Sequence, residues 1–331
     1  MNVHCQTLKT NVMFSLLLSV CVITPVFADV VKVTPLGSHD GEFCGRDRAL
    51  VFEDPDGTRL LYDAGRTVAG PDDPRLGRVD GILVSHMHGD HVGNVHMKKT
   101  NQGSCGKPDT PVNVLPNTNS VNIALAKDAV IITGSEMPKF FASKLKSLGG
   151  NPKQSQLVRF GGSKKVGSVT ITTVPAVHSN GIAPGMIGGE LGHMLSASGI
   201  TAYAGPPTGY VLTFSNGLVV YLSGDTGITA EQKSVVGKYY NATLAVMNIG
   251  DTYTTGPEEA AFVTNELVKP NAVIASHANE AATRNGKVVG GTRTETFMKA
   301  TKVPVYLPLS GITMQFNNKG LCTQGCKSYI N

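Results

Sequence analysis

The chain contains no tryptophan, and only 6% of its 331 residues are aromatic and 16% are charged. So low a charge content is not typical of intrinsically disordered proteins, and 41% hydrophobic residues are enough to form a buried core. The 38 glycines favour an α/β or β-rich globule with many tight turns. Because the formal charge is only +5 and no run of lysine or arginine occurs, we do not expect a nucleic-acid partner.

Long apolar stretches are also scarce, and the clearest one lies at the N-terminus. Residues 12–27 read VMFSLLLSVCVITPVF, and Lys9 is the only charged residue among the first 28. The stretch ends in Val-Phe-Ala, which fits a signal-peptidase site, so we expect a signal peptide over residues 1–28 and a periplasmic or secreted protein. Since Pro25 interrupts an already short apolar stretch, we expect no stable membrane insertion after cleavage behind Ala28.

Cysteine is sparse as well, with six in the chain, of which Cys5 and Cys21 would leave with the signal peptide. A lipoprotein anchored at Cys21 is the alternative, but Val20 precedes it where glycine or alanine is expected. An even number of cysteines in an exported chain predicts two disulfides rather than free thiols or a metal site. The four that remain allow three pairings, of which we prefer Cys44–Cys105 and Cys322–Cys326.

The first half of the remaining chain is predicted to be rich in strands. Residues 29–37 favour an opening strand, and residues 49–65 a hairpin that turns at Asp56-Gly57. Residues 81–86 follow as a short buried strand. Amphipathic patterns then predict two helices, at residues 119–128 and 137–150.

The second half continues this pattern and completes an α/β fold. Its predicted strands include a hairpin that turns at Asn216-Gly217, and its helix begins near Pro257 and ends at Pro270. No linker separates the halves, so we predict a signal peptide (1–28) followed by one catalytic domain (29–331). The expected strands cover residues 167–179, 209–227, 244–251, 271–277 and 303–316, and the helix covers residues 256–270.

Four potential metal ligands come just after predicted apolar strands: His86, His178, Asp225 and His277. Strand ends of a layered α/β fold open onto a common edge, where ligand sites form. We therefore expect these four side chains to meet at one rim, although each histidine alone could be an ordinary surface residue.

The stretch SHMHGDHVGN places three of the nine histidines and one aspartate within residues 86–91. His86 and His88 are two apart, so an extended backbone directs both imidazoles to one cation. Asp90 and His91 follow where the chain turns, and can serve a second cation. A catalytic zinc ion has about three protein ligands, so each ion lacks one. His178 and His277 can supply the missing ligands, and Asp225 can bridge the two ions.

These residues resemble the metallo-β-lactamase superfamily, whose signature is His-x-His-x-Asp-His. YDAG, VPAVHS, YLSGDTG and VIASH resemble its other motifs, and the likeness covers nearly all of the chain after the signal peptide. MNIGDTYTTGPEEAAFVTNELVKPNAVIASH is similar to the branch that contains ascorbate-phosphate lactonases and related metal-dependent hydrolases. The resemblance implies a four-layer αββα sandwich, and it makes Asp63 a partner of a metal-site residue.

The resemblance also implies a hydrolase with two divalent metal ions, zinc being expected and manganese or iron(II) the alternatives. One ion would be held by His86, His88 and His178, the other by Asp90, His91 and His277, with Asp225 between them. A metal-bridging hydroxide would attack a lactone or another ester-type bond. The alternatives are a β-lactamase, a phosphodiesterase and a metal-binding protein without turnover. The sequence does not predict the oligomeric state of the protein.

Three residues are candidates for catalytic roles beyond metal binding. Asp90 would orient the hydroxide, and His193, Tyr253 or a water on the second metal would give a proton to the leaving group. His193 lies in the glycine-rich stretch 181–209, for which we expect a cover over the site rather than a mere insertion. Its Met and Leu side chains would form an apolar wall of the pocket, and His193 would face the metals; these side chains are Met186, Leu191, Met194 and Leu195. Such a wall favours a small-molecule substrate with a hydrophobic portion.

Overall fold

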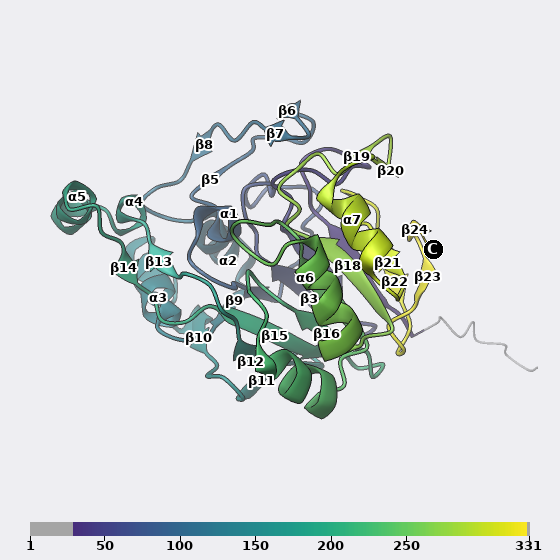
Figure 1. The fold of residues 1–331 in the computed structure, drawn as a ribbon. Helices are drawn as coiled ribbons and strands as arrows, with labels where there is room; N and C mark the ends of the chain where they lie inside the picture. Colours follow the sequence, from purple (N-terminus) through teal and green to yellow (C-terminus); the bar gives the residue numbers. More distant parts are fainter. Residues whose placement is uncertain (1–28, 330–331) are drawn as a thin grey trace, which may run out of the picture.

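Two eight-stranded β-sheets face one another in the computed structural model, which describes residues 29–329 (Figure 1). The predicted signal peptide therefore lies outside the described residues. The first sheet has the order β10-β9-β4-β3-β2-β1-β22-β23. Its strands are β1 (Val31–Pro35), β2 (Leu50–Glu53), β3 (Arg59–Tyr62), β4 (Gly81–Leu83), β9 (Val130–Thr133), β10 (Ser155–Leu157), β22 (Met314–Phe316) and β23 (Cys322–Gln324).

The second sheet has the order β11-β12-β15-β16-β17-β18-β21-β24. Neighbouring strands β16, β17, β18 and β21 run parallel, whereas β11, β12, β15 and β16 pair antiparallel. The strands are β11 (Ser163–Val166), β12 (Val169–Pro175), β15 (Thr208–Thr213), β16 (Val219–Leu222), β17 (Leu244–Asn248), β18 (Ala272–Ser276), β21 (Val305–Tyr306) and β24 (Ser328–Tyr329).

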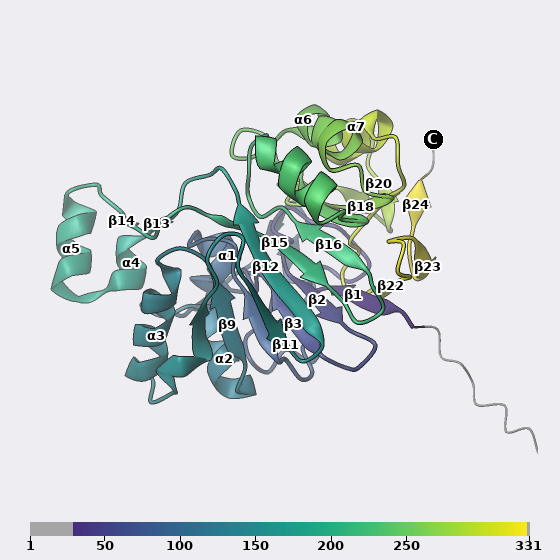
Figure 2. The ribbon, with the colours of Figure 1, turned by 90° about the horizontal axis from the view of Figure 1, so that it is seen from below.

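Helices cover the outer face of each sheet, which confirms the predicted αββα sandwich (Figure 2). The first sheet is covered by α2 (Asn119–Lys127) and α3 (Met137–Ser147), with η1 (Pro152–Gln154) following α3. The second is covered by the π-helices η2 (Gln232–Tyr239) and η3 (Val263–Val268), and by α6 (Pro257–Phe262) and α7 (Arg293–Ala300). No helix of the described residues is long and apolar enough to cross a membrane.

The side chains of each strand alternate between the core that separates the two sheets and the core beneath the covering helices. In β2, Leu50 and Phe52 belong to the core between the sheets, whereas Val51 belongs to the core under α2 and α3. In β18, Ile274 lies between the sheets and Val273 faces the helices of the other layer. Because successive side chains of a strand point to opposite faces, both faces of each sheet must be apolar when helices cover them.

The prediction of one closing strand over residues 303–316 is wrong. The segment is divided between the sheets, with β21 in the second and β22 in the first. Pro308 lies between them and cannot donate a ladder hydrogen bond, and Gly311 has a φ of 75°. The chain therefore crosses from one sheet to the other at this point.

Two excursions leave the sandwich. Residues 181–203 form β13 (Gly181–Ile182), α4 (Pro184–Ile187), α5 (Gly189–Ala197) and β14 (Ala202–Tyr203), and the two helices project sideways (Figure 2). The second excursion, residues 95–113, contains β5 (Val95–His96), β6 (Gly103–Ser104), β7 (Lys107–Pro108) and β8 (Val112–Asn113). A further hairpin joins β19 (Thr283–Arg284) to β20 (Lys287–Val288).

Both predicted disulfides are present. Cys44–Cys105 joins the loop after β1 to the second excursion, and Cys322–Cys326 closes a short loop near the C-terminus. Gly45 N donates to Cys105 O at 2.9 Å, so backbone and disulfide together hold residues 95–113 against residues 44–48. This contact forms one wall of the site described below.

Candidate metal centre

The seven potential metal ligands that the sequence predicted come together at one edge of the two sheets. His86 follows β4, His178 follows β12, Asp225 follows β16 and His277 follows β18. The remaining three lie in the turn after β4. The common strand-end position expected from the sequence is therefore present.

A single helical turn, α1 (Gly89–Val92), arranges the central motif. His88 precedes it in extended conformation, and Gly93 ends it with a φ of 73°. A Cβ at Gly93 would lie 2.3 Å from Gly65 O, so only glycine allows this close approach. Because the backbone changes here from extended to helical, the side chains of Asp90 and His91 point in a different direction from those of His86 and His88.

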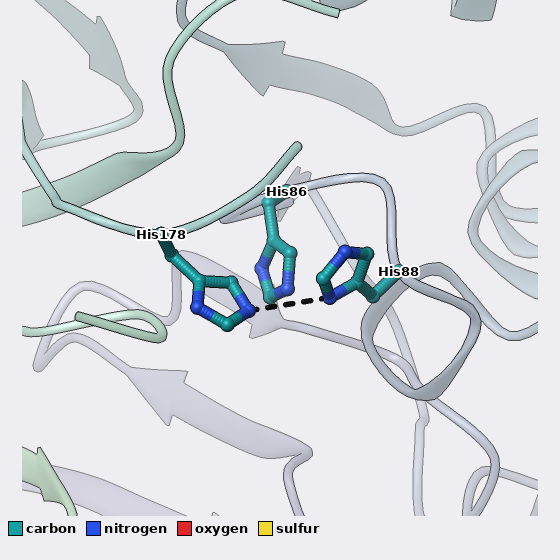
Figure 3. Close-up of side chains that lie close together, drawn as sticks. All are labelled: His86, His88 and His178. Carbon is teal, nitrogen blue, oxygen red and sulfur yellow. Dashed lines mark hydrogen bonds between the residues drawn. The ribbon is translucent and has the colours of Figure 1, made fainter. Parts of the chain in front are cut away.

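His86, His88 and His178 form the first group (Figure 3). Their imidazole nitrogens lie within 4.8 Å of one another, and His178 Nε2 is 3.3 Å from His88 Nδ1. His86 is buried, whereas His88 and His178 are partly exposed. One metal ion could contact all three nitrogens from the open side.

Asp90, His91 and His277 form the second group. Asp90 Oδ2 is 3.6 Å from His91 Nε2 and 3.5 Å from His277 Nε2. Asp225 lies between the groups: its Oδ2 is 3.0 Å from His277 Nε2 and 3.7 Å from His178 Nε2. A single carboxylate oxygen therefore reaches both groups.

Buried nitrogen atoms without partners show that the groups suit a cation. Nε2 of His86, His91 and His277 is buried and has no hydrogen-bond partner within residues 29–329. The carboxylate oxygen Oδ2 of Asp225 lies 3.3 Å from His91 Nε2 and 3.0 Å from His277 Nε2. Since unpaired buried polar atoms are costly, these lone pairs fit coordination of metal ions.

Asp63 contacts the ring nitrogen of His91 that faces away from the metal centre. Its Oδ2 lies 2.8 Å from His91 Nδ1, so His91 Nε2 points to the centre. Ser85 donates from its backbone N–H and its hydroxyl to the two Asp63 oxygens, each at 2.8 Å, and the same hydroxyl lies 2.9 Å from His86 Nδ1. Such contacts set the orientation of metal-binding histidines. Asp63 thus has the supporting position that the resemblance implied.

The charges of the site also favour a cation. Burial lowers the pKa of His86, His88 and His178, which keeps their imidazoles neutral. Burial acts in the same direction on His91, but Asp225, Asp63 and Asp90 raise its pKa well above the usual value. Burial raises the pKa of both Asp90 and Asp225, yet neighbouring histidines outweigh it and keep the two carboxylates ionised. Neutral imidazole and ionised carboxylate are the forms that bind metals, so His91 would release its proton when a metal ion binds.

A cavity of about 390 Å³ lies over these residues. Tyr253, a proposed proton donor, lines this cavity, although its side chain is 70% exposed. His193, the other donor candidate, is exposed on α5 and does not line this cavity. Leu191 and Met194 are likewise exposed, so the expected apolar wall is not formed by these two side chains.

Four residues that line the cavity were not indicated by any sequence pattern: Arg46, Arg48, Arg66 and Asn279. They come from loops that show no periodic pattern. The only hint in the sequence was that Arg46 and Arg48 lie close together in a chain with few charges, whereas Arg66 stands alone.

Three comparisons with known proteins agree with this geometry. A family model described as a beta-lactamase superfamily domain matches residues 58–278, a range that includes all seven potential ligands. A metal-dependent hydrolase of Koribacter versatilis is 27% identical over 236 residues, which is 70% of this chain and 82% of that protein.

Solved structures with the same fold give the third comparison. A metallo hydrolase of the archaeon Ignicoccus hospitalis has a TM-score of 0.52 at 20% identity, covering 87% of this chain and 99% of its own. The metallo-β-lactamase fold protein YhfI of Bacillus subtilis has a TM-score of 0.51 at 14% identity, with the same two coverages. At such identities these structures support the fold alone.

Proposed function

We propose that this chain, which belongs to the metallo-β-lactamase superfamily and is a metal-dependent hydrolase, opens a lactone or another ester-type bond outside the cytoplasm. We further propose that it uses two divalent ions, with zinc as the metal. The observation that carries the two-ion proposal is the position of Asp225 Oδ2 between two groups of three potential ligands. Histidine and carboxylate ligands at a site with an open side are typical of catalytic zinc.

Each ligand would have a defined task in this reaction. His86, His88 and His178 would hold one ion, and Asp90, His91 and His277 the other, with the Asp225 carboxylate shared. When bound, the ions would lower the pKa of a coordinated water to about 7 and polarise the substrate carbonyl. Asp90 would orient the attacking water through its second carboxylate oxygen.

Proton delivery to the leaving group is assigned to Tyr253 in preference to His193, because Tyr253 lines the cavity. Replacing Tyr253 with Phe removes only the hydroxyl, so kcat should fall by about 100-fold while KM changes little. His193→Ala should leave kcat unchanged. If His193→Ala lowers kcat and Tyr253→Phe does not, the assignment is reversed.

We place a hydrophobic portion of the substrate in a second hollow that begins at His178. Val177, Tyr203, Pro206 and Pro207 line it, with Val177 62% exposed and Tyr203 76% exposed. These apolar surfaces could bind an acyl or alkyl group beside the reacting bond. Tyr203→Ser should raise KM for long-chain lactones and leave KM for short-chain lactones unchanged.

Export is supported by the two disulfides, because such bonds persist in oxidising compartments. Expression of the full chain in a Gram-negative host, followed by fractionation and N-terminal sequencing, tests it. A mature protein beginning at Asp29 in the periplasm or the medium is expected. Uncleaved protein in the cytoplasm would contradict the proposal.

The decisive experiment measures metal content and substrate range on one purified sample. Zinc should be bound at two ions per chain, and a panel of lactones, a chromogenic β-lactam and a chromogenic phosphodiester should show preference for lactones. A chelator should abolish turnover, and added zinc should restore it. Preference for the β-lactam or the phosphodiester would replace the lactone proposal, and turnover that survives complete metal removal would refute it.

A further inference from the structure

Three arginine side chains line the cavity over the metal centre. Arg46, Arg48 and Arg66 all line it, whereas the only carboxylates among the described lining residues are Asp90 and Asp225. Both carboxylates belong to the candidate ligand set, so bound divalent ions would neutralise them. The cavity would then carry a strong excess of positive charge.

Arg48 already has partners. It contacts Asp90 Oδ2 at 3.3 Å and donates to Asn279 Oδ1 at 2.6 Å, and its side chain is almost fully buried. Its charge is therefore used within the protein. The other two arginines differ, because in the described part of the chain neither forms an ion pair with a carboxylate.

Arg66 is held by a neutral partner. Its Nε and Nη2 donate to Asn94 Oδ1, both at 3.1 Å, which leaves Nη1 available. A Cβ at Gly89 would lie 2.9 Å from Arg66 Nη2, so Arg66 lies directly against the start of α1. Burial lowers the pKa of Arg66, the Asp90 carboxylate acts in the opposite direction, and Arg46 and Arg48 act in the same direction as burial.

Arg46 is held by a rigid loop. Its Nη1 donates to Thr110 Oγ1 at 3.2 Å, across the contact that the Cys44–Cys105 disulfide fixes. Asp47 accepts hydrogen bonds from Ser38 N at 2.9 Å and Cys44 N at 2.8 Å, which fixes the backbone on the other side. Nε and Nη2 of Arg46 remain for a ligand.

We propose that Arg46 and Arg66 form an anion-binding subsite, and that the hydrolysed substrate carries a carboxylate or phosphate group bound there. The planar guanidinium fork matches both anions, and charge-assisted hydrogen bonds are the stronger kind. Because both arginines are held in place before binding, little conformational freedom is lost. This inference rests on the proposed function for the identity of the reacting bond.

The subsite would determine how the bound substrate is oriented across the metal centre. Its anionic end would lie between residues 44–48 and Arg66, on the side of Asp90 and His277. Its apolar end would lie beyond His178, in the hollow of Val177 and Tyr203. The reacting carbonyl between the two ends would then be over the metals.

The test uses three matched lactones: γ-butyrolactone bearing a γ-carboxylate, the same compound as its carboxamide, and γ-hydroxymethyl-γ-butyrolactone phosphate. Zinc-loaded wild type, Arg46→Gln, Arg66→Gln, the double variant and the exposed control Arg78→Gln are compared. Turnover is followed by pH-stat, and binding is measured separately by calorimetry. Zinc content is measured in every sample, so that a change in metal binding is seen.

The wild type should prefer an anionic lactone to the carboxamide in kcat/KM and in affinity. Each single variant should lower that preference about 10-fold, the value of one charge-assisted contact, and the double variant about 100-fold. Arg78→Gln should leave it unchanged. The ratio between carboxylate and phosphate affinities tells which anion the subsite prefers.

Two results would overturn the inference: equal affinity of the wild type for the anionic and neutral lactones, or an unchanged preference in the double variant. The calorimetry separates this failure from failure of the proposed function. If no lactone is turned over but anionic lactones bind in an Arg46- and Arg66-dependent way, the subsite stands and the reaction assignment falls.

Discussion

The guanidinium of Arg48 lies 3.3 Å from Asp90 Oδ2 and also holds Asn279, two residues after His277. Arg48 therefore connects both sides of the second ligand group from a buried position. It orients Asp90 and also lines the cavity over the centre.

Replacing Arg48 with Met should lower kcat/KM by about 10- to 100-fold, the usual effect of removing a group that orients a metal ligand. It should also destabilise the fold by about 1 to 2 kcal/mol, because the partly exposed Asp90 carboxylate and Asn279 Oδ1 lose their hydrogen-bond partner. Arg48→Lys keeps the charge and should recover part of the stability. Steady-state kinetics and urea unfolding of zinc-loaded samples check both values, and full activity of Arg48→Met would contradict the positioning role.

Removing one potential ligand should disturb metal binding without unfolding the chain. His88→Ala and Asp225→Ala should each lower zinc content below two ions per chain and reduce turnover by at least about 1000-fold, since the metal supplies several kcal/mol of transition-state stabilisation. His39→Ala is the matched control, because His39 lies in a polar loop outside the ligand set. Full zinc and full activity in His88→Ala would make the two-metal assignment wrong.

The Cys44–Cys105 disulfide closes a span of 61 residues. Loop-closure entropy for a span of this length predicts a loss of about 4 kcal/mol of unfolding free energy in the Cys44→Ser/Cys105→Ser variant. Cys322→Ser/Cys326→Ser removes a loop of only four residues and should cost much less. Peptide mapping of the oxidised protein should find no free thiol, and four alkylated cysteines without reduction would refute the pairing.

Asp47 should give stability an unusual dependence on pH. Burial raises its pKa from 3.8 to about 6. Between about pH 4 and pH 6 the folded state therefore binds more protons at this group than the unfolded state does. The contribution of Asp47 to the unfolding free energy then decreases as pH rises, by about 3 kcal/mol over the full shift.

Asp47→Asn cannot ionise and should lack this decrease. Urea unfolding of both proteins at several pH values from 4 to 7 measures it. The difference in free energy between wild type and variant should change across the range in the direction stated, whatever its absolute size, since all other titrating groups are shared. A pH-independent difference would show that Asp47 has an ordinary pKa.

Much of the fold and of the candidate site was predictable from local patterns. Asp56-Gly57 and Asn216-Gly217 indicated the two hairpins, and alternation of apolar residues indicated which segments are strands. The spacing of His86, His88, Asp90 and His91 by itself predicted two ligand pairs, because backbone geometry relates close residues directly. His178, Asp225 and His277 were found because each follows an apolar strand, and strand ends share an edge.

Other features depended on contacts between distant segments, and only the tertiary structure decided them. Residues 303–316 were predicted as one strand, but the chain passes from one sheet to the other between β21 and β22, near Pro308 and Gly311. Arg46 and Arg66 are isolated charges in loops, and no local pattern directs them to a cavity. They meet because the disulfide holds residues 44–48 over the site while Asn94 holds Arg66 against α1. Sequence spacing determines how near neighbours are arranged, whereas the convergence of loops depends on how the whole chain packs.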